Sequence, residues 1–254
     1  MIKITVLTTI ALTGLMAAQG AIAQEEKESP DQYIYATYFY CDTSKQEAVD
    51  AEVMKYMVPV YDAAVADGTI GNWGWMAHHT GGKWRRLQYH TANSIDGLLA
   101  AQNTIGERMD KVDVGDDVFS QACNAHDDYI WKRVIGNELQ VERGSAGLSV
   151  YEICEINRET RADEIVEKVF APVFNKAVAD GKLASWGWNE HILGGKFRRL
   201  MTMTGKDFPS LLKTRGEILD ELYGEDGDNP EANEYADICG SHADYLWEIQ
   251  HEKN

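Results

Sequence analysis

The motif His-x-Asp-Tyr-x-Trp occurs twice in the chain, beginning at His126 and at His242. Residues two positions apart lie on the same face of an extended strand, so each histidine is expected beside Asp128 or Asp244. A carboxylate in that position can orient an imidazole and stabilise its charged form, which suits acid–base chemistry. The alternative is a structural hydrogen bond between the two side chains, and the presence of the pair in both copies favours it.

A second group of reactive side chains lies in a fifteen-residue segment, Trp73 to Leu87, which returns 113 positions later as Trp186 to Leu200. Ten of the fifteen positions are identical. Unrelated segments would share about one position in fifteen at ordinary composition, so the chain is interpreted as a tandem duplication. The tryptophans of this segment could contact an aromatic ligand, and its histidines and arginines could bind an anionic group.

The paired glycines Gly81-Gly82 and Gly194-Gly195 predict a two-residue hairpin turn in each copy. Such a turn fixes which residues share a face. One face is expected to carry Trp73, Trp75, Ala77, Trp84, Arg86 and His90, matched by Trp186, Trp188, Glu190, Phe197, Arg199 and Met203. The other is expected to carry Met76, His78, Arg85 and Leu87, matched by Asn189, His191, Arg198 and Leu200. Neither face is wholly apolar, so the pattern leaves open which one lines a cavity.

The two copies differ opposite the second arginine of the hairpin. Glu190 is expected to form an ion pair with Arg199, whereas Arg86 faces Ala77. A buried Arg86 would then need another anion, such as Asp128 or a bound ligand, and the alternative is that it reaches solvent. The first copy also has His79 and His90 where the second has Ile192 and Met203. These differences predict that binding is centred on the first half.

Each copy is expected to fold in the order strand, helix, strand, strand, helix, strand. The predicted first strands are Tyr33–Cys41 and Leu148–Cys154, and the first helices are Ala48–Asp67 and Arg161–Asp180, with a kink or restart at Pro59 and Pro172. Second helices are expected over Ser94–Val112 and Lys206–Tyr223, and last strands after Cys123 and Cys239. The second copy has three extra residues near the acidic loop Glu225–Glu231. A solvated loop is favoured there over a calcium site, because the EF-hand spacing is missing.

Residues 1–23 have a basic start, a short apolar run and a small-residue end, which predict a signal peptide, with a retained anchor helix as the alternative. Residues 24–32 are expected to form a flexible tail, 33–136 the first repeat, 137–147 a linker and 148–250 the second repeat. The net charge of −17 argues against nucleic acid as a partner. We expect a soluble periplasmic or secreted protein that does not insert into a membrane after cleavage.

The duplicated strand–helix order, with a central hairpin rich in Trp, His and Arg, resembles the dimeric α/β-barrel superfamily. That superfamily includes antibiotic-biosynthesis-monooxygenase-like, stress-responsive-barrel and EthD-like proteins and the chlorite-dismutase group. The resemblance implies an α+β fold in which two tandem ferredoxin-like βαββαβ units pack sheet to sheet as a pseudo-dimer. It also implies small apolar or aromatic ligands, sometimes haem.

The four cysteines are Cys41, Cys123, Cys154 and Cys239, two in each copy at corresponding positions. An even, symmetric set in an exported protein is typical of disulfides, and the ferredoxin-like order brings the first strand within reach of the loop before the last. We therefore expect Cys41 to bond with Cys123 and Cys154 with Cys239. A Cys/His metal site is the alternative, but one thiolate and one imidazole would leave the coordination sphere half empty, so no metal site is predicted.

Three functions remain open. The first is an exported protein that binds a small ligand in a cavity lined by Trp, Tyr, His and Arg. This ligand is expected to be apolar or aromatic, with an anionic group as an option. The second is a cofactor-independent or haem-dependent oxygenase or lyase with the same fold, and the third is a structural module. No nucleophilic triad, zinc-protease, phosphate-loop or dinucleotide motif is present, and self-association into a homo-oligomer is left open. The candidate ligand-binding residues are Trp73, Trp75, His78, Arg86, His90, His126, Tyr129, Trp188, His191, Arg199, His242 and Tyr245.

Overall fold

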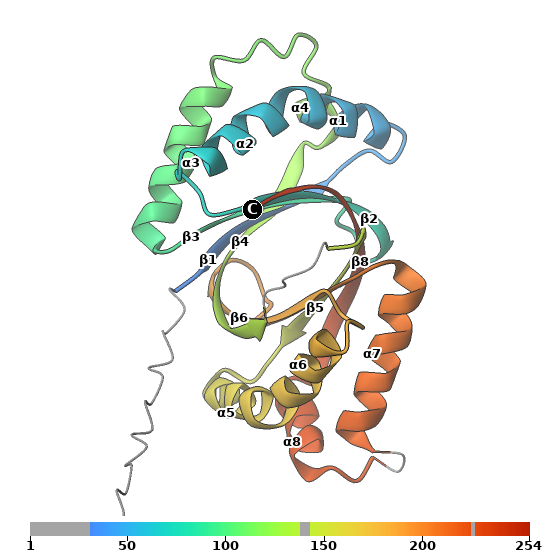
Figure 1. Ribbon diagram of the computed structural model, residues 1–254. Helices are drawn as coiled ribbons and strands as arrows, with labels where there is room; N and C mark the ends of the chain where they lie inside the picture. Colours follow the sequence, from blue (N-terminus) through green and yellow to red (C-terminus); the bar gives the residue numbers. More distant parts are fainter. Residues whose placement is uncertain (1–30, 138–142, 225–226) are drawn as a thin grey trace, which may run out of the picture.

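The computed structural model describes residues 31–137, 143–224 and 227–254 and shows a closed antiparallel barrel of eight strands. Helices α1 to α4 cover one side of the barrel and α5 to α8 cover the opposite side (Figure 1). The predicted signal peptide, residues 24–30 of the predicted tail and residues 138–142 of the predicted linker lie outside the described residues.

The same order of elements occurs in both halves, except that the second half has the additional short helix η2. The first half contains β1 (Tyr33–Tyr40), α1 (Gln46–Glu52), η1 (Val53–Met57), α2 (Val58–Ala66), β2 (Trp73–Gly81), β3 (Arg86–Ala92), α3 (Ile95–Met109), α4 (Val118–Ala122) and β4 (Ala125–Asn137). The second contains β5 (Ala146–Ile153), η2 (Ile156–Arg158), α5 (Glu159–Ile165), η3 (Val166–Phe170), α6 (Ala171–Ala179), β6 (Ser185–Leu193), β7 (Arg199–Gly205), α7 (Phe208–Tyr223), α8 (Pro230–Ile238) and β8 (Ser241–Lys253). The sequence pattern missed the short helices α4 and α8, which precede the last strands.

Each long first helix contains one widened turn just before its proline. The π-helical turns η1 and η3 immediately precede α2 and α6, in which Pro59 and Pro172 lie in the first turn. Proline has no N–H and its ring crowds the preceding turn, so the wider turn accommodates it without ending the helix. The expected interruption at the prolines is therefore present as a π-turn. The predicted cap at Ser94 is also present, because its side chain accepts a hydrogen bond from the Gly97 N–H.

The barrel order is β1-β3-β2-β8-β5-β7-β6-β4, so each half supplies four neighbouring strands. Two seams, β2 with β8 and β4 with β6, join the halves and close the barrel. Within the hairpins, Trp73 pairs with His90 and Trp186 with Met203, which is the register that was predicted. The predicted two-residue turn itself was wrong, because strand pairing ends at Ala77 with Arg86 and at Glu190 with Arg199.

The buried residues form two kinds of core. Trp73 and Trp75 pack beneath the helices of the first half, and Trp186 and Trp188 do so in the second. Met76, Leu87 and Leu200 belong to a separate cluster inside the barrel. This cluster also contains Trp84 and Phe197, which were predicted on the opposite face. That prediction was wrong because strand pairing in the hairpins ends at Arg86 and Arg199, so the alternation of faces does not continue into the loop.

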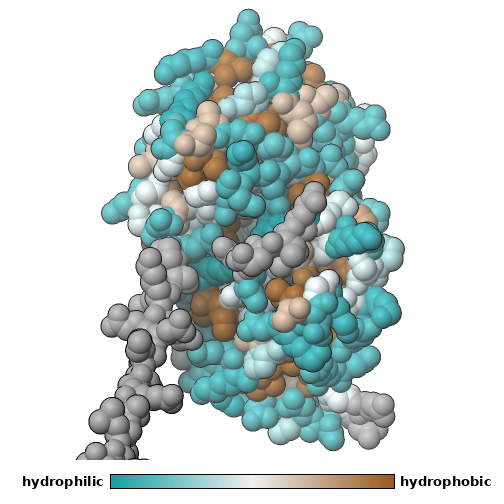
Figure 2. All heavy atoms as spheres, in the orientation of Figure 1, coloured by the Kyte–Doolittle hydropathy of each residue, from teal (hydrophilic) through white to brown (hydrophobic). Residues whose placement is uncertain are grey.

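Both expected disulfides are present in the structure. Cys41 bonds with Cys123 across 82 residues, and Cys154 bonds with Cys239 across 85 residues. In the chain-entropy model a loop of this length contributes on the order of 4 kcal/mol to stability. Among the described residues, no helix has the length and apolar character needed to cross a membrane. The face shown in Figure 2 is mostly hydrophilic, with hydrophobic residues in small separate groups.

The closed seams predict that the halves do not fold well apart. Residues 31–137 alone would expose the edges of β2 and β4 and one face of their sheet, which in the whole chain is covered by the other half. We expect this fragment to dimerise or aggregate when it is expressed alone. Size-exclusion chromatography with light scattering measures this directly. A stable monomer that unfolds cooperatively would show that the seams are dispensable.

Candidate functional site

The two tryptophans that begin each repeated segment make matched structural contacts under the helices. The indole Nε1 atoms of Trp73 and Trp75 donate to Asp62 and Asp50, each over 2.8 Å. In the second half, the indoles of Trp186 and Trp188 donate to Asn175 and Asp163 over the same distance. These buried indoles hold the first helix of each half against its sheet.

Both hairpin arginines are buried and paired with an aspartate of the first helix. Arg86 donates from Nε and Nη2 to the two oxygens of Asp50, over 2.6 and 2.5 Å. Arg199 does the same with Asp163, over 2.8 and 2.7 Å, and also contacts Glu159. Arg86 therefore has the other anion that its burial requires, but this anion is Asp50 and neither Asp128 nor a ligand. The expectation that Glu190 is the ion-pair partner of Arg199 was wrong, because its acids come from α5 and not from the facing strand.

His90, one of the two histidines found only in the first copy, is fully buried beneath the helices and stacks on Tyr35. Burial lowers the pKa of its imidazole to about 4, so the ring is neutral at physiological pH. The other, His79, is exposed and stacks on Phe208. The structure therefore separates these two imidazoles from each other and from the Arg86 ion pair.

His78 and His191 form equivalent contacts with the preceding arginine of each hairpin. Nη1 of Arg85 lies 2.9 Å from Nδ1 of His78, and Nη1 of Arg198 lies 2.8 Å from Nδ1 of His191. Guanidinium groups can only donate, so Nδ1 must accept and the ring is neutral. Burial and the neighbouring arginine charge both lower the pKa of each imidazole. These histidines lie edge-on to Tyr245 and Tyr129, respectively.

Each Gly-Gly loop packs against the last strand of the other half. The Lys83 N–H donates to the hydroxyl of Tyr245 over 3.0 Å, and a Cβ at Gly82 would collide with that hydroxyl. A Cβ at Gly195 would collide in the same way with the hydroxyl of Tyr129. The repeated glycines and tyrosines therefore form reciprocal contacts that join the two halves.

The His-x-Asp pairs lie at the surface. Nδ1 of His126 lies 3.1 Å from Asp128, and Nδ1 of His242 lies 2.6 Å from Asp244. Each imidazole is 49% exposed. Both pairs have the geometry that the sequence predicted, and in the second half Arg215 also binds Asp244, over 2.7 Å.

An apolar cavity of about 240 Å³ lies between the sheet and helices α6, α7 and α8 of the second half. Its walls include Phe170, Phe174, Met201, Met203 and Leu222, and His242 and Arg215 also line it. Glu152 of β5 is the only carboxylate among its lining residues and is 6% exposed. A single acid in an apolar cavity is a candidate site for acid–base chemistry.

Glu152 is held by one hydrogen bond. The Tyr235 hydroxyl donates to its Oε2, while no described residue bonds to Oε1. Burial raises the pKa of Glu152 to about 8, and the hydrogen bond from Tyr235 acts in the opposite direction. The carboxyl group is therefore mostly protonated at neutral pH, but its pKa is close enough to that pH for it to gain or lose a proton.

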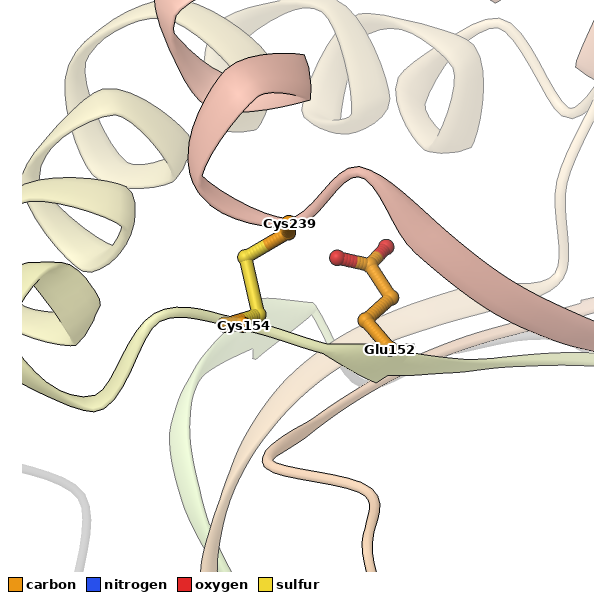
Figure 3. Close-up of side chains that lie close together, drawn as sticks. All are labelled: Glu152, Cys154 and Cys239. Carbon is orange, nitrogen blue, oxygen red and sulfur yellow. A yellow bond between two sulfur atoms is a disulfide. The ribbon is translucent and has the colours of Figure 1, made fainter.

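Glu152 rises from β5 on the same side as the Cys154–Cys239 disulfide (Figure 3). Its carboxylate and the two sulfur atoms lie within 4.8 Å of one another. The sulfurs are bonded to each other and cannot act as thiolate ligands, so this cluster is a poor metal site in the oxidised protein.

Glu152 and Tyr235 escaped the sequence prediction because they belong to no motif. At the corresponding positions the first half has Phe39 and Phe119, whose rings pack 5.1 Å apart. The second half thus replaces a pair of apolar rings by a buried acid and a phenol. A comparison of the two copies along β1 and β5 would have revealed this exchange.

The raised pKa of Glu152 predicts a pH-dependent stability. Its value rises from 4.5 to about 8 on folding, so between these limits the folded protein keeps a proton that the unfolded chain releases. The free energy of unfolding should therefore fall with increasing pH over this range, by up to about 1.4 kcal/mol per pH unit. Urea unfolding of wild type and Glu152→Gln from pH 5 to 8 measures the difference. A difference that does not change with pH would show that Glu152 is ionised in the folded protein.

No protein-family model and no curated protein matches the sequence. Solved structures with the same architecture include a proposed monooxygenase from Lactobacillus acidophilus, with a TM-score of 0.58 and 6% identity over 88% of this chain and 96% of that one. An anthrone oxidase-like protein has a TM-score of 0.56 and 10% identity, over 89% and 94% of the two chains. A chlorite dismutase from Candidatus Nitrospira defluvii has a TM-score of 0.55 and 7% identity, over 88% and 92%. The chain therefore has the dimeric α/β-barrel fold that these proteins share.

Proposed function

We propose that the protein is an enzyme that transfers a proton to or from a small apolar or aromatic substrate in the Glu152 cavity. The observation that carries this proposal is the buried carboxyl group, which has one oxygen without a partner among the described residues and is the only carboxylate among the cavity's lining residues. A site of this kind binds its substrate by apolar contact and presents it with one proton-transfer group.

In the proposed reaction the ionised form of Glu152 acts as the general base. Its Oε1 accepts a proton from a hydroxyl or an activated C–H group of the substrate, and the Tyr235 hydroxyl remains bonded to Oε2. Burial of the carboxyl group raises its pKa, so that it can hold a proton near neutral pH. The product of this step is an electron-rich aromatic anion. Such anions can react with dioxygen without a metal or flavin, which is the chemistry of a cofactor-independent oxygenase.

The size and walls of the cavity support a small aromatic substrate. About 240 Å³ is below the usual range of 300–1,000 Å³ for drug-sized ligands, and phenylalanine and methionine side chains line it. Monooxygenase and anthrone oxidase-like proteins among the structures with this fold agree with an aromatic substrate. We infer the substrate class from the cavity and not from these proteins.

A haem-dependent reaction does not fit this cavity. A haem is larger than the ligands that a cavity of this volume accommodates. The one imidazole among the lining residues, His242, is half exposed and bonded to Asp244. No step is therefore assigned to haem.

We also propose that the protein is exported and that its sequence arose by tandem duplication. The predicted signal peptide and the two disulfides support a periplasmic or secreted protein. The ten identical positions and the repeated element order support a tandem duplication of a ferredoxin-like unit. Under this proposal, the chemistry is confined to the second half, because the first half has Phe39 and Phe119 at the positions of Glu152 and Tyr235.

Oxygen uptake tests the proposed function. The mature, oxidised protein is incubated with single- and multi-ring phenols and anthrones, and products are identified by mass spectrometry. We expect uptake with a subset of these compounds that depends on Glu152. Binding without turnover would favour a ligand-binding protein, and the absence of both across the panel would contradict the proposal.

A further inference from the structure

A second cavity, of about 120 Å³, lies inside the barrel and is lined by strands from both halves. Tyr38, Met76, Leu87 and Leu200 are among the residues that line it. A cavity of about 150 Å³ in an engineered lysozyme holds one benzene molecule, so the barrel cavity matches roughly one aromatic ring. It is separate from the Glu152 cavity, which lies on the helix side of the sheet.

Among the described residues, three buried hydrogen-bond donors that line this cavity have no partner within 3.5 Å, although the Tyr38 hydroxyl still acts on two of them, Trp131 and Tyr151. They are Nε1 of Trp131, Nε1 of Trp247 and the hydroxyl of Tyr151, and all three side chains are 0% exposed. An unpaired buried donor costs about 1–3 kcal/mol, and native proteins rarely leave one unsatisfied. Three such donors around one cavity point to an occupant that accepts hydrogen bonds.

The orientation of these donors is fixed by packing. Trp131 stacks on Tyr129 with ring centroids 5.0 Å apart, and Trp247 stacks on Tyr245 with centroids 5.1 Å apart. Indole N–H groups can only donate. Burial raises the pKa of Tyr151 well above its ordinary value, so this phenol keeps its proton and can donate as well.

The charge of the lining also favours an acceptor. Arg133 and Arg143 are both among the described residues that line the cavity, and none of these residues carries a carboxylate. Arg143 and the Tyr89 hydroxyl both donate hydrogen bonds to the carboxylate of Glu252, which is not among the lining residues, over 2.7 and 2.6 Å respectively. In a protein with a net charge of −17, this lining suits an anionic group better than a cation.

The second half has smaller residues than the first at two positions of the cavity wall. Gly147 and Thr202 line the cavity, and the first half has Ile34 and Tyr89 at the corresponding positions. Restoring a larger side chain at Gly147 is compatible with the backbone, since a Cβ there would make only ordinary contacts of 3.6–3.9 Å. The cavity can therefore be filled without removing any donor.

We propose that the barrel cavity is a binding site for a single-ring aromatic carboxylate, whose ring packs among the aromatic and aliphatic walls and whose oxygens accept hydrogen bonds from Trp131, Trp247 and Tyr151. The site is independent of the proposed chemistry at Glu152. It is an accessory ligand site within the barrel.

Benzoate is the probe for this site. It is titrated up to about 10 mM into the whole protein without the predicted signal peptide, and this concentration range detects a millimolar affinity. The readout is the NMR signal of each indole N–H among the seven tryptophans, assigned by Trp→Phe replacement at Trp131 and Trp247. We expect benzoate to shift these two signals and to bind more tightly than toluene, which lacks the acceptor, or acetate, which lacks the ring.

Two variants of cavity residues test binding, and a third distinguishes this site from the proposed active site. Tyr151→Phe removes a hydroxyl that has no hydrogen-bond partner within 3.5 Å among the described residues, so it should change the thermal midpoint little and weaken benzoate binding by about 10- to 100-fold. Gly147→Val should abolish binding by filling the cavity. Glu152→Gln should leave the benzoate-induced shifts unchanged, which distinguishes this site from the proposed active site.

The proposal is overturned if benzoate shifts neither indole signal while the two indole N–H groups exchange with water. The cavity would then be a hydration site. It is also overturned if toluene binds as tightly as benzoate, or if Tyr151→Phe and Gly147→Val bind benzoate as the wild type does.

Discussion

Glu152→Gln is expected to lower turnover of any substrate found for this protein by about 10²- to 10⁴-fold, the usual contribution of a general acid or base. Glutamine keeps the shape of the side chain and an oxygen that can accept the Tyr235 hydrogen bond, but it cannot take a proton. Substrate affinity should change little, because the apolar walls of the cavity are intact. In the wild type, kcat/KM should rise with pH through about 8, the pKa of the free carboxyl group.

Two control variants make this result specific. Tyr235→Phe keeps the carboxyl group and removes the hydrogen bond that lowers its pKa, so the pH profile should move to higher pH. Glu190→Gln changes an acid of β6 that does not line the cavity and should leave turnover unchanged. Full activity in Glu152→Gln, or a pH profile unaffected by Tyr235→Phe, would show that Glu152 is not the base.

The two buried arginines are expected to contribute equally to stability. Arg86→Ala and Arg199→Ala each leave an aspartate without its bidentate partner and should each lower the free energy of unfolding by about 3–5 kcal/mol. Arg215→Ala is the matched control, since its pair with Asp244 is about a third exposed and should contribute less than about 1 kcal/mol. Chemical denaturation measures all three.

A loss confined to Arg199→Ala would restore the asymmetry that the sequence suggested. It would mean that Arg86 does not depend on Asp50 for its burial. Equal losses would show that the hairpin arginines are structural in both halves.

The fold was predictable because its signals are periodic and local. The paired glycines predicted the hairpin register, and the matched cysteines, in the predicted element order, gave the disulfide pairing. The short helices α4 and α8 were missed because segments of five and nine residues carry little periodicity.

The candidate site was less predictable because the conspicuous residues have structural partners far away in the sequence. Asp50 lies 36 residues from Arg86, and Tyr245 lies 162 residues from Lys83. Neither contact leaves a local pattern. Several of the repeated residues were proposed as ligand-binding, and the structure places Trp73, Trp75, Trp188, Arg86 and Arg199 in contacts between helix and sheet.

The proposed site rests on a difference between the two halves that lies outside the hairpins. The comparison of the hairpins drew attention to Ala77 and Glu190. The titratable group of the cavity is Glu152, which has Phe39 as its counterpart and lies on a strand that the comparison of the hairpins did not include.

The protonation state of Glu152 tests the central claim most directly, and it needs no substrate. The infrared difference spectrum between wild type and Glu152→Gln isolates the carbonyl stretch of the protonated carboxyl group. We expect this band to be present at pH 6 and to disappear as the pH rises through about 8. Absence of the band at pH 6 would show an ionised Glu152 and would contradict a carboxyl group tuned for proton transfer.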